Sequence, residues 1–268
     1  MLRTPMENNI VAAGYDAVFA TADSSPTLRR LWRQHASGLD FPDGFDHISF
    51  TTLDQLRIIA TNLRLSPGSV LVDVGCGMAG PALWVARETG AHLTGVDLSA
   101  VAVAQATARA ARLGLQDHAR FVNGTFAATG LPAASADAVM SEDALQYATD
   151  KRAAVSEFAR ILRPGGRLVF AAFELEPERV AGLPVLGDDP VADYRPLLQE
   201  AGFTVDACDE VPGWLEALTA AYTAVLDARD TLTAEMGAPG VAALLGEITL
   251  TLQLRPYRRR VLAIATKN

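Results

Sequence analysis

The chain has 268 residues, half of them hydrophobic and 20% charged, with a formal net charge of −8. This length suffices for one large α/β domain with additions and a full hydrophobic core. The acidic balance argues against nucleic acid as a partner, because phosphate binding requires basic surface. We also find no apolar run near the roughly 18 residues that span a membrane, so no membrane partner is expected.

Two cysteines, Cys76 and Cys208, are too few for a disulfide framework and suit a reducing compartment. Residues 1–5 contain no apolar segment of the kind found in secretion signals. Both observations favour a cytoplasmic protein.

Residues 1–65 show the apolar spacing of amphipathic helices separated by turn signals at 23–26 and 41–44. Thr52 with Gln55 three residues later is a capping-box pattern and predicts a helix that begins there. We therefore predict an N-terminal helical cap over residues 1–65, followed by a core domain over 66–268.

From residue 66 onward, strand and helix patterns alternate. The predicted strands are 70–74, 92–96, 120–123, 137–141, 167–173, 203–207 and 261–265, and the predicted helices are 79–88, 99–113, 151–162 and 191–201. Such alternation predicts an α/β fold with a doubly wound, Rossmann-like, mostly parallel sheet of about seven strands.

One segment, 211–257, is too long for a plain connection between the last two strands. It predicts two helices around Gly237-Ala238-Pro239-Gly240, inserted as a lid or as the arm of a homodimer. The basic run Arg258-Arg259-Arg260 then opens the last strand, where it predicts protection of a sheet edge.

The most informative motif follows the first predicted strand. Gly75, Gly77 and Gly80 have the spacing G-x-G-x-x-G, and Asp97 lies about 20 residues beyond, as in a nucleotide-ribose site. Asp73 stands two residues before the first glycine, where its carboxylate would repel a pyrophosphate but suit an ammonium group. S-adenosylmethionine has an ammonium group and a ribose diol but no phosphate. The turn therefore favours this methyl donor over NAD.

With this turn and two further strings, the chain resembles class I S-adenosylmethionine-dependent methyltransferases, in particular the small-molecule enzymes of bacterial natural-product pathways. The strings are Leu162-Arg163-Pro164-Gly165-Gly166 before the fifth strand and Ser141-Glu142-Asp143-Ala144-Leu145-Gln146-Tyr147 at the end of the fourth. The resemblance implies methyl transfer from S-adenosylmethionine to a hydroxyl, amine or activated carbon of an apolar small molecule.

The resemblance also implies roles for residues around the cofactor. Gly75 and Gly77 would let the backbone approach the methionine part, and Gly80 would let the helix pack on the strand. Asp97 would accept the ribose hydroxyls, and Leu98 would pack on the adenine. The other residues expected at the cofactor are Tyr15 over its carboxylate, Asp73, Cys76 in the glycine turn, Thr125, Phe126 and Ser141. The family usually has an acid at the position of Thr125, and the Phe126 N–H would face the ring.

Three residues are candidates for the chemistry of the acceptor. His47 ordinarily titrates near neutral pH and is the preferred base, although it also suits a capping role. Tyr147 stands where the family often has histidine, and either orients the acceptor or packs. Glu142 is a further base candidate or an anchor for the cofactor's ammonium group.

Trp214 begins the inserted segment and is expected either as the core anchor of the lid or as a wall of the acceptor pocket. No cysteine or histidine pair has the spacing of metal ligands, so we expect no metal.

Other functions remain open at this stage. A cofactor-retaining cyclase or decarboxylase on the same scaffold would carry the same motifs. An NAD-dependent oxidoreductase would need a Tyr-x-x-x-Lys or comparable group, which we do not find, and Asp73 argues against it. A non-catalytic binding subunit would show damaged cofactor motifs. A nucleic-acid methyltransferase would carry an Asn/Asp-Pro-Pro-aromatic string, which is absent from the sequence.

Overall fold

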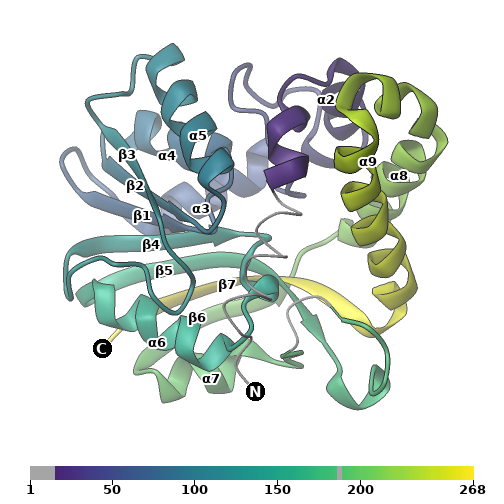
Figure 1. The fold of residues 1–268 in the computed structure, drawn as a ribbon. Coiled ribbons are helices and arrows are strands. Elements are labelled where there is room, and N and C mark those ends of the chain that lie inside the picture. The colour runs from purple at the N-terminus through teal and green to yellow at the C-terminus, as the bar shows by residue number, and fades with distance from the viewer. Residues whose placement is uncertain (1–15, 186–188) are drawn as a thin grey trace.

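A seven-stranded sheet forms the centre of the structure, with strand order β3-β2-β1-β4-β5-β7-β6 (Figure 1). The computed structural model describes residues 16–185 and 189–268, and Tyr15 lies outside them. The strands are β1 (Val70–Val74), β2 (His92–Asp97), β3 (Ala119–Asn123), β4 (Ala136–Glu142), β5 (Leu162–Leu175), β6 (Phe203–Glu210) and β7 (Arg258–Lys267). Only the pairs that include β7 are antiparallel. The predicted Rossmann-like, mostly parallel sheet is confirmed.

Strand β5 begins earlier than the sequence predicts. Its first residue, Leu162, pairs with Ala136, and the next pair is Arg167 with Ala138. The Pro164-Gly165-Gly166 turn therefore forms an irregularity within the ladder between β4 and β5, and not a separate turn before the strand.

The position of β7 corrects the predicted role of its arginines. Strand β7 pairs with β5 on one side and β6 on the other, so it is an inner strand and not an edge. Arg258 and Arg260 are accordingly buried. Protection of a sheet edge is the wrong interpretation for them.

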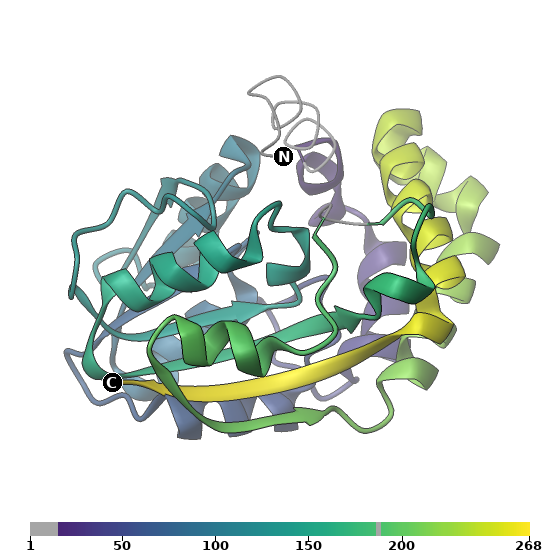
Figure 2. The ribbon, with the colours of Figure 1, turned by 90° about the horizontal axis from the view of Figure 1, so that it is seen from below.

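Helices cover both faces of the sheet (Figures 1 and 2). One face carries α3 (Leu53–Leu63), α4 (Gly80–Thr89) and α5 (Ala100–Arg112). The other carries α6 (Lys151–Ile161) and α7 (Tyr194–Glu200). Neighbouring strand residues alternate between the two apolar clusters, as a sheet buried on both faces requires: Leu71 faces the first and Val72 the second.

The predicted helix starts at Thr52 and Ser99 are confirmed. The Thr52 hydroxyl accepts from the Gln55 N–H at 3.2 Å, and the Ser99 hydroxyl accepts from the Ala102 N–H at 3.0 Å. Helix α3 nevertheless packs on β5 and α4, so this part of residues 1–65 belongs to the core layer and not to a cap.

The cap consists of two parts that are distant in sequence. Its N-terminal part is helical residues 16–22, α2 (Pro26–Trp32) and the π-helix η1 (Arg33–Ser37), and its late part is α8 (Trp214–Asp227) and α9 (Arg229–Leu254). Both parts share one apolar cluster, and α2 lies beside α8 and α9 at one end of the sheet (Figure 1). Short 3-10 turns complete the elements: η2 (Leu145–Tyr147), η3 (Pro177–Arg179) and η4 (Arg255–Tyr257).

Polar contacts also join the two parts of the cap. Glu235 of α9 accepts from the Ser25 hydroxyl at 2.5 Å and from the Thr27 hydroxyl at 2.6 Å. Its Oε2 also accepts from the Thr27 N–H at 3.1 Å. The insertion is thereby tied to the start of α2.

The inserted helices differ in detail from the prediction. The predicted break around Gly237 is present, because that glycine has the non-helical angles φ 75° and ψ 160° within α9. A further break, between α8 and α9 at Ala228, was not predicted. By length and composition alone, residues Arg229–Tyr257 could also cross a membrane, contrary to the sequence expectation. Helices of soluble cores meet the same criterion, and Leu232, Leu244 and Ile248 of α9 pack inside the cap.

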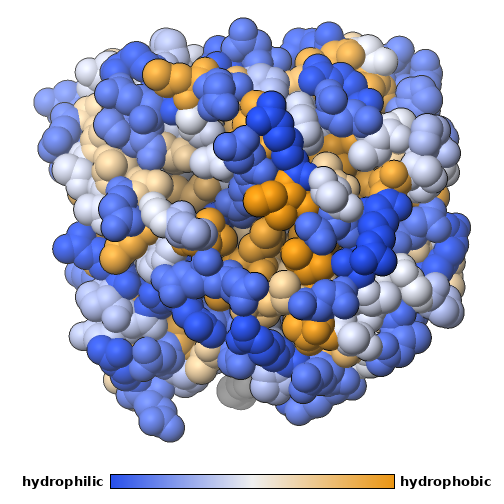
Figure 3. Space-filling model, turned by 180° about the vertical axis from the view of Figure 1, so that it is seen from behind, coloured by the Kyte–Doolittle hydropathy of each residue, from blue (hydrophilic) through white to orange (hydrophobic). Residues whose placement is uncertain are grey.

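The molecular surface seen from behind is mostly hydrophilic, with hydrophobic side chains gathered toward its middle (Figure 3). Among the described residues, the large hydrophobic side chains with the greatest exposure are Leu39, Ile58, Leu98, Leu183, Leu215 and Leu226.

Candidate active site

A cavity of about 350 Å³ lies between the carboxyl ends of the strands and the cap. Its floor comes from the segments that follow β1, β2, β3 and β4, where ligands bind in open α/β sheets. Its other walls come from segment 47–50 and from Phe19, Tyr222, Glu247 and Thr251 of the cap. The cavity therefore brings the glycine turn together with the segments expected to hold an acceptor.

Asp73 lines this cavity from the end of β1 and is 4% exposed. Its Oδ1 atom is buried without a hydrogen-bond partner among the described residues. Burial, together with the nearby charge of Asp97, raises the pKa of Asp73 to about 8. A buried carboxyl group that lacks a donor fits an incoming ammonium group, as the sequence predicts for S-adenosylmethionine.

The glycine turn is compact because two of its positions have no room for a side chain. At Gly75, which has φ 77°, a Cβ atom would lie 2.6 Å from the Ala144 Cβ and 2.9 Å from Phe126 Cζ. At Gly80, a Cβ atom would meet the carbonyl oxygens of Phe45 and Asp46. Gly80 thus makes room for the segment before α3, which differs from the predicted packing of helix on strand.

Asp97 connects the glycine turn to the start of α5 through hydrogen bonds from two backbone N–H groups. Its Oδ2 accepts from the Gly77 N–H at 2.8 Å, and its Oδ1 accepts from the Ser99 N–H at 2.9 Å. Each carboxylate oxygen has two lone pairs, so both can still accept a ribose hydroxyl. Asp97 is only partly buried and lines the cavity, which is compatible with the predicted ribose site.

Most of the other residues expected at the cofactor also line the cavity: Cys76, Leu98, Thr125 and Phe126. Burial raises the pKa of the Cys76 thiol well above its usual value, so this side chain packs as a neutral group. Ser141 is different. It is absent from the cavity lining, and its hydroxyl donates to the Val74 carbonyl at 2.7 Å, which ties β4 to β1.

Glu142 and Tyr147 line the part of the cavity that faces the cap. The Oε2 of Glu142 accepts from the Thr51 hydroxyl at 2.8 Å, and its Oε1 is buried without a partner among the described residues. Burial and the charge of Asp143 raise the pKa of Glu142 to about 8. The Tyr147 hydroxyl donates to Glu247 Oε1 of α9 at 2.6 Å.

His47 lines the cavity, but its expected titration near neutral pH is wrong. Burial, together with the charges of Arg109 and Arg260, lowers the pKa of His47 to about 3. Its Nδ1 contacts the Ser49 hydroxyl at 2.8 Å. The imidazole is therefore neutral at physiological pH and a weak base.

Trp214 anchors the inserted helix α8 in the apolar cluster of the cap and is not a wall of the pocket. It is 6% exposed, lies outside the cavity lining and belongs to the apolar cluster of the cap. Its Nε1 donates to Glu210 Oε1 at 2.7 Å, and its ring meets Phe173 edge-on with the centroids 5.6 Å apart.

The sequence did not single out several residues that line the cavity, among them Tyr222, Glu247, Thr251 and Arg258. Glu247 and Thr251 are four residues apart in an apolar helical segment, so a polar pair on one helix face is the signal that could have found them. Tyr222 and Arg258 carry no comparable signal, because only the tertiary fold brings them to the cavity.

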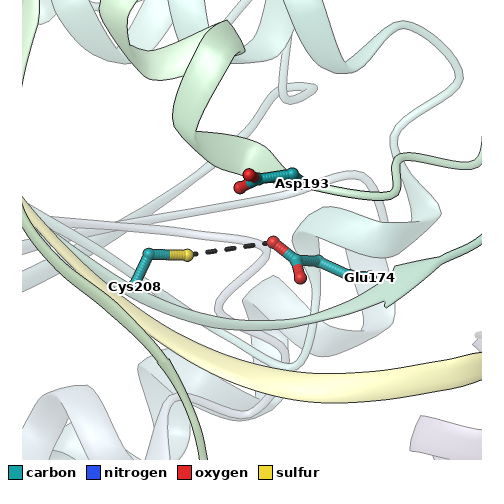
Figure 4. Close-up of side chains that lie close together, drawn as sticks. All are labelled: Glu174, Asp193 and Cys208. Carbon is teal, nitrogen blue, oxygen red and sulfur yellow. Dashed lines mark hydrogen bonds between the residues drawn. The ribbon is translucent and has the colours of Figure 1, made fainter.

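One group of side chains outside the cavity has the donor set of a metal site. The ligand atoms of Glu174, Asp193 and Cys208 lie within 4.8 Å of one another (Figure 4). Glu174 already accepts from the Tyr194 N–H at 2.9 Å and from Arg259 Nε at 2.6 Å. Asp193 accepts from the Arg195 N–H at the start of α7. We interpret the group as a link between β5, β6 and α7, because its oxygens are engaged and a guanidinium lies against it.

Comparison with known proteins identifies methyltransferases as relatives of this chain. A model of the methyltransferase domain family matches residues 72–170. Methyltransferase GfsG of Streptomyces halstedii is 32% identical over 193 residues, which are 67% of this chain and 68% of that protein. The 27-O-demethylrifamycin SV methyltransferase of Amycolatopsis mediterranei is 28% identical over 225 residues, covering 78% and 80% of the two chains. A sterol 24-C-methyltransferase of Gibberella zeae is 38% identical, but the match spans only 30% of that protein.

Solved structures share the fold. The [4+2]-cyclase SpnF superposes with a TM-score of 0.73 at 23% identity, covering 96% of this chain and 94% of that one. A sarcosine dimethylglycine methyltransferase described as putative, from Galdieria sulphuraria, gives a TM-score of 0.70 at 16% identity, covering 80% and 84%.

The fold and the site together define a Rossmann-like enzyme with a nucleoside-binding turn and a capped cavity beside it. This chain belongs to the class I S-adenosylmethionine-dependent methyltransferases, and its relatives include enzymes of the natural-product type.

Proposed function

We propose that this chain methylates an oxygen, nitrogen or activated carbon atom of an apolar small molecule in the biosynthesis of a natural product, as a cytoplasmic enzyme that acts without nucleic acid. The observation that carries the proposal is the shared cavity. It joins the glycine turn, Asp73 and Asp97 to a second region lined by aromatic and polar side chains of the cap.

On the cofactor side, Asp73 would hold the ammonium group through the carboxylate oxygen that has no partner in the described residues. Asp97 would accept the ribose hydroxyls, while Leu98 and Phe126 enclose the adenine. The cofactor supplies an electrophilic methyl group.

On the acceptor side, Phe50, Phe173 and Tyr222 provide apolar walls. Holding two reactants in line can supply roughly 7–11 kcal/mol of the barrier reduction. The hydrogen-bonded pair of Tyr147 and Glu247 spans from the end of β4 to α9 and would orient the acceptor.

For a hydroxyl acceptor, Glu142 is the base that the site supports best. Its pKa of about 8 is close to neutral pH, and its Oε1 is free of hydrogen bonds to the described residues. A base with a pKa near the working pH is the most effective one. His47, with a pKa of about 3, does not meet this condition.

The test is product analysis with S-adenosylmethionine and a panel of apolar hydroxyl, amine and activated-carbon compounds. The proposal requires a product one methyl group heavier than its acceptor, with one S-adenosylhomocysteine formed for each. A rearranged or decarboxylated product without S-adenosylhomocysteine would instead identify a cyclase or decarboxylase. The cyclase alternative is retained because the [4+2]-cyclase SpnF has a similar fold.

A further inference from the structure

Arg258, the first residue of β7, is a buried charge that faces the cavity without an ionic partner among the described residues. Its side chain lines the cavity and the residue is 9% exposed. Its Nε atom has no hydrogen-bond partner among the described residues, and no carboxylate of that part of the chain forms an ion pair with it. A buried N–H group in this state is costly, because it has lost water without gaining an acceptor.

The other buried arginines show that Arg258 is exceptional. Four arginines are buried in residues 16–185 and 189–268. Three of them have a carboxylate partner: Arg109 with Asp23, Arg167 with Asp206, and Arg260 with Asp143. The neighbouring Arg259 is also paired, with Glu174. Arg258 alone in this set faces the cavity without such a partner.

The carboxyl group whose charge acts on Arg258, that of Glu247, does not neutralise it fully. Glu247 acts on Arg258 through its charge, but its Oε1 accepts from the Tyr147 hydroxyl. Burial raises the pKa of Glu247, which favours its neutral form. Arginine remains protonated in proteins. This region of the cavity therefore keeps a positive charge available to a ligand.

The guanidinium of Arg258 lies over an aromatic ring. Its guanidinium carbon lies 4.6 Å from the centroid of Phe173, and Phe173 itself lines the cavity. Stacking on a ring holds the guanidinium plane and leaves its edge for a planar, two-oxygen acceptor such as a carboxylate. The cavity thus presents the Phe173 ring beside the Arg258 guanidinium, an arrangement that suits an apolar ligand with an anionic group.

We propose that Arg258 binds an anionic oxygen group of the acceptor. The acceptor would then be an apolar molecule with a carboxylate or an ionised phenol or enol. This inference rests on the proposed function, because it assigns the chemistry of the acceptor in the same cavity. Arg258 acts here as a binding residue that selects and places the acceptor.

The experiment measures binding to the full chain saturated with S-adenosylhomocysteine, after titration has shown that this cofactor product binds. The probes are matched pairs: naphthoate with naphthamide, cinnamate with cinnamamide, and nitrophenolate with nitrobenzene. We expect at least one anion to bind about tenfold more tightly than its neutral counterpart, as charge-assisted hydrogen bonds allow. The carboxylate and phenolate arms show which anionic oxygen the site prefers.

Variants of Arg258 test whether its side chain causes the preference for anionic probes. Arg258→Gln and Arg258→Met should reduce the ratio of anion to neutral affinity to near one, and Arg258→Lys should retain part of it. Arg259→Gln is the matched control, since this neighbour pairs with Glu174 outside the cavity and should leave the ratio unchanged. Thermal unfolding identifies which variants fold. If either Arg258→Gln or Arg258→Met fails to fold, the other still provides the test.

Two results would overturn the inference: equal binding of anion and neutral probe in every pair, or a preference that survives both Arg258→Gln and Arg258→Met. Failure of S-adenosylhomocysteine to bind would count against the proposed function instead. Anion selectivity measured without the cofactor product would then still show whether Arg258 forms the site.

Discussion

Arg260 of β7 and Asp143, which follows β4 and lines the cavity, form a two-pronged ion pair. Nε lies 2.7 Å from Oδ1 and Nη2 lies 3.0 Å from Oδ2, and the side chains are 1% and 6% exposed. Asp143 Oδ2 also accepts from the Phe50 N–H at 2.7 Å. The pair thus connects the inner antiparallel strand, the end of β4 and the segment that enters the cavity.

We expect Asp143→Ala to destabilise the protein by about 3–5 kcal/mol, because it leaves the Arg260 charge buried without its carboxylate. Urea unfolding followed by circular dichroism measures the change. Glu200→Ala is the control: it removes the partner of Arg152 in a pair whose side chains are 52% and 64% exposed, and it should cost less than about 1 kcal/mol. Similar losses of unfolding free energy for both variants would mean that the buried ion pair stabilises the protein no more than an exposed one.

The parts of the site that the sequence predicts are those encoded by local spacing. Asp73, the glycines and Asp97 occupy successive strand ends, and parallel pairing of β1 with β2 brings them together. The capping residues Thr52 and Ser99 act within their own helix turns, so they too can be predicted from the sequence.

Features that depend on distant contacts could not be predicted. The inner position of β7 requires an antiparallel insertion between β5 and β6, and that position buries Arg258 and Arg260. The pKa of His47 follows from burial and from two arginines that are distant in sequence. Trp214 faces the cap because α8 packs on η1 and α2, which no local pattern shows.

Trp214→Ala should act on stability and not on acceptor binding. Its indole is buried in the cap and lies outside the cavity lining, so its loss leaves a void that costs about 3–5 kcal/mol. Tyr222→Ala provides the contrast, because Tyr222 lines the cavity and should raise KM for the acceptor. Denaturant unfolding and steady-state kinetics on both variants separate the roles. A large KM increase for Trp214→Ala at unchanged stability would restore the pocket-wall interpretation.

Asp97→Ala should weaken S-adenosylmethionine binding at least about tenfold, since hydrogen bonds to a charged group contribute about 1.5–3 kcal/mol. The loss would also free the N–H groups of Gly77 and Ser99, which Asp97 holds at 2.8 and 2.9 Å. Asp97→Asn therefore serves as the companion variant that preserves shape. Calorimetric titration measures both, and unchanged affinity in both would remove Asp97 from the cofactor site.

His47→Gln should lower activity modestly without moving the acidic limb of the pH profile. The buried imidazole has a pKa of about 3, so it does not change charge between pH 5 and pH 8. Glu142→Gln should instead remove the limb that reports a base, if the acceptor is a hydroxyl. The measurement is kcat/KM against pH for both variants and the parent protein. Loss of a limb near neutral pH in His47→Gln alone would reverse this assignment.

The raised pKa of Asp73 makes cofactor binding depend on pH. Without the cofactor, the carboxyl group is protonated below its pKa of about 8. An ammonium group favours the ionised form, so binding below that pH releases a proton and affinity should rise with pH, by at most about tenfold per unit. The same shift has the opposite sign for stability. A carboxyl group whose pKa is raised on folding destabilises the cofactor-free fold progressively as pH rises from about 4 to about 8.

Asp73→Asn tests both effects in one variant. Its affinity for S-adenosylhomocysteine should be lower than that of the parent protein at pH 8 and nearly flat between pH 6 and pH 8, because the titrating group is gone. Its cofactor-free form should also lose less stability over that interval, since a neutral amide carries no ionisation cost. Calorimetry in buffers of different ionisation enthalpy counts the protons released, and urea unfolding across pH reports the stability. A parent protein that binds with equal affinity at pH 6 and pH 8 and releases no proton would show that Asp73 does not hold the ammonium group.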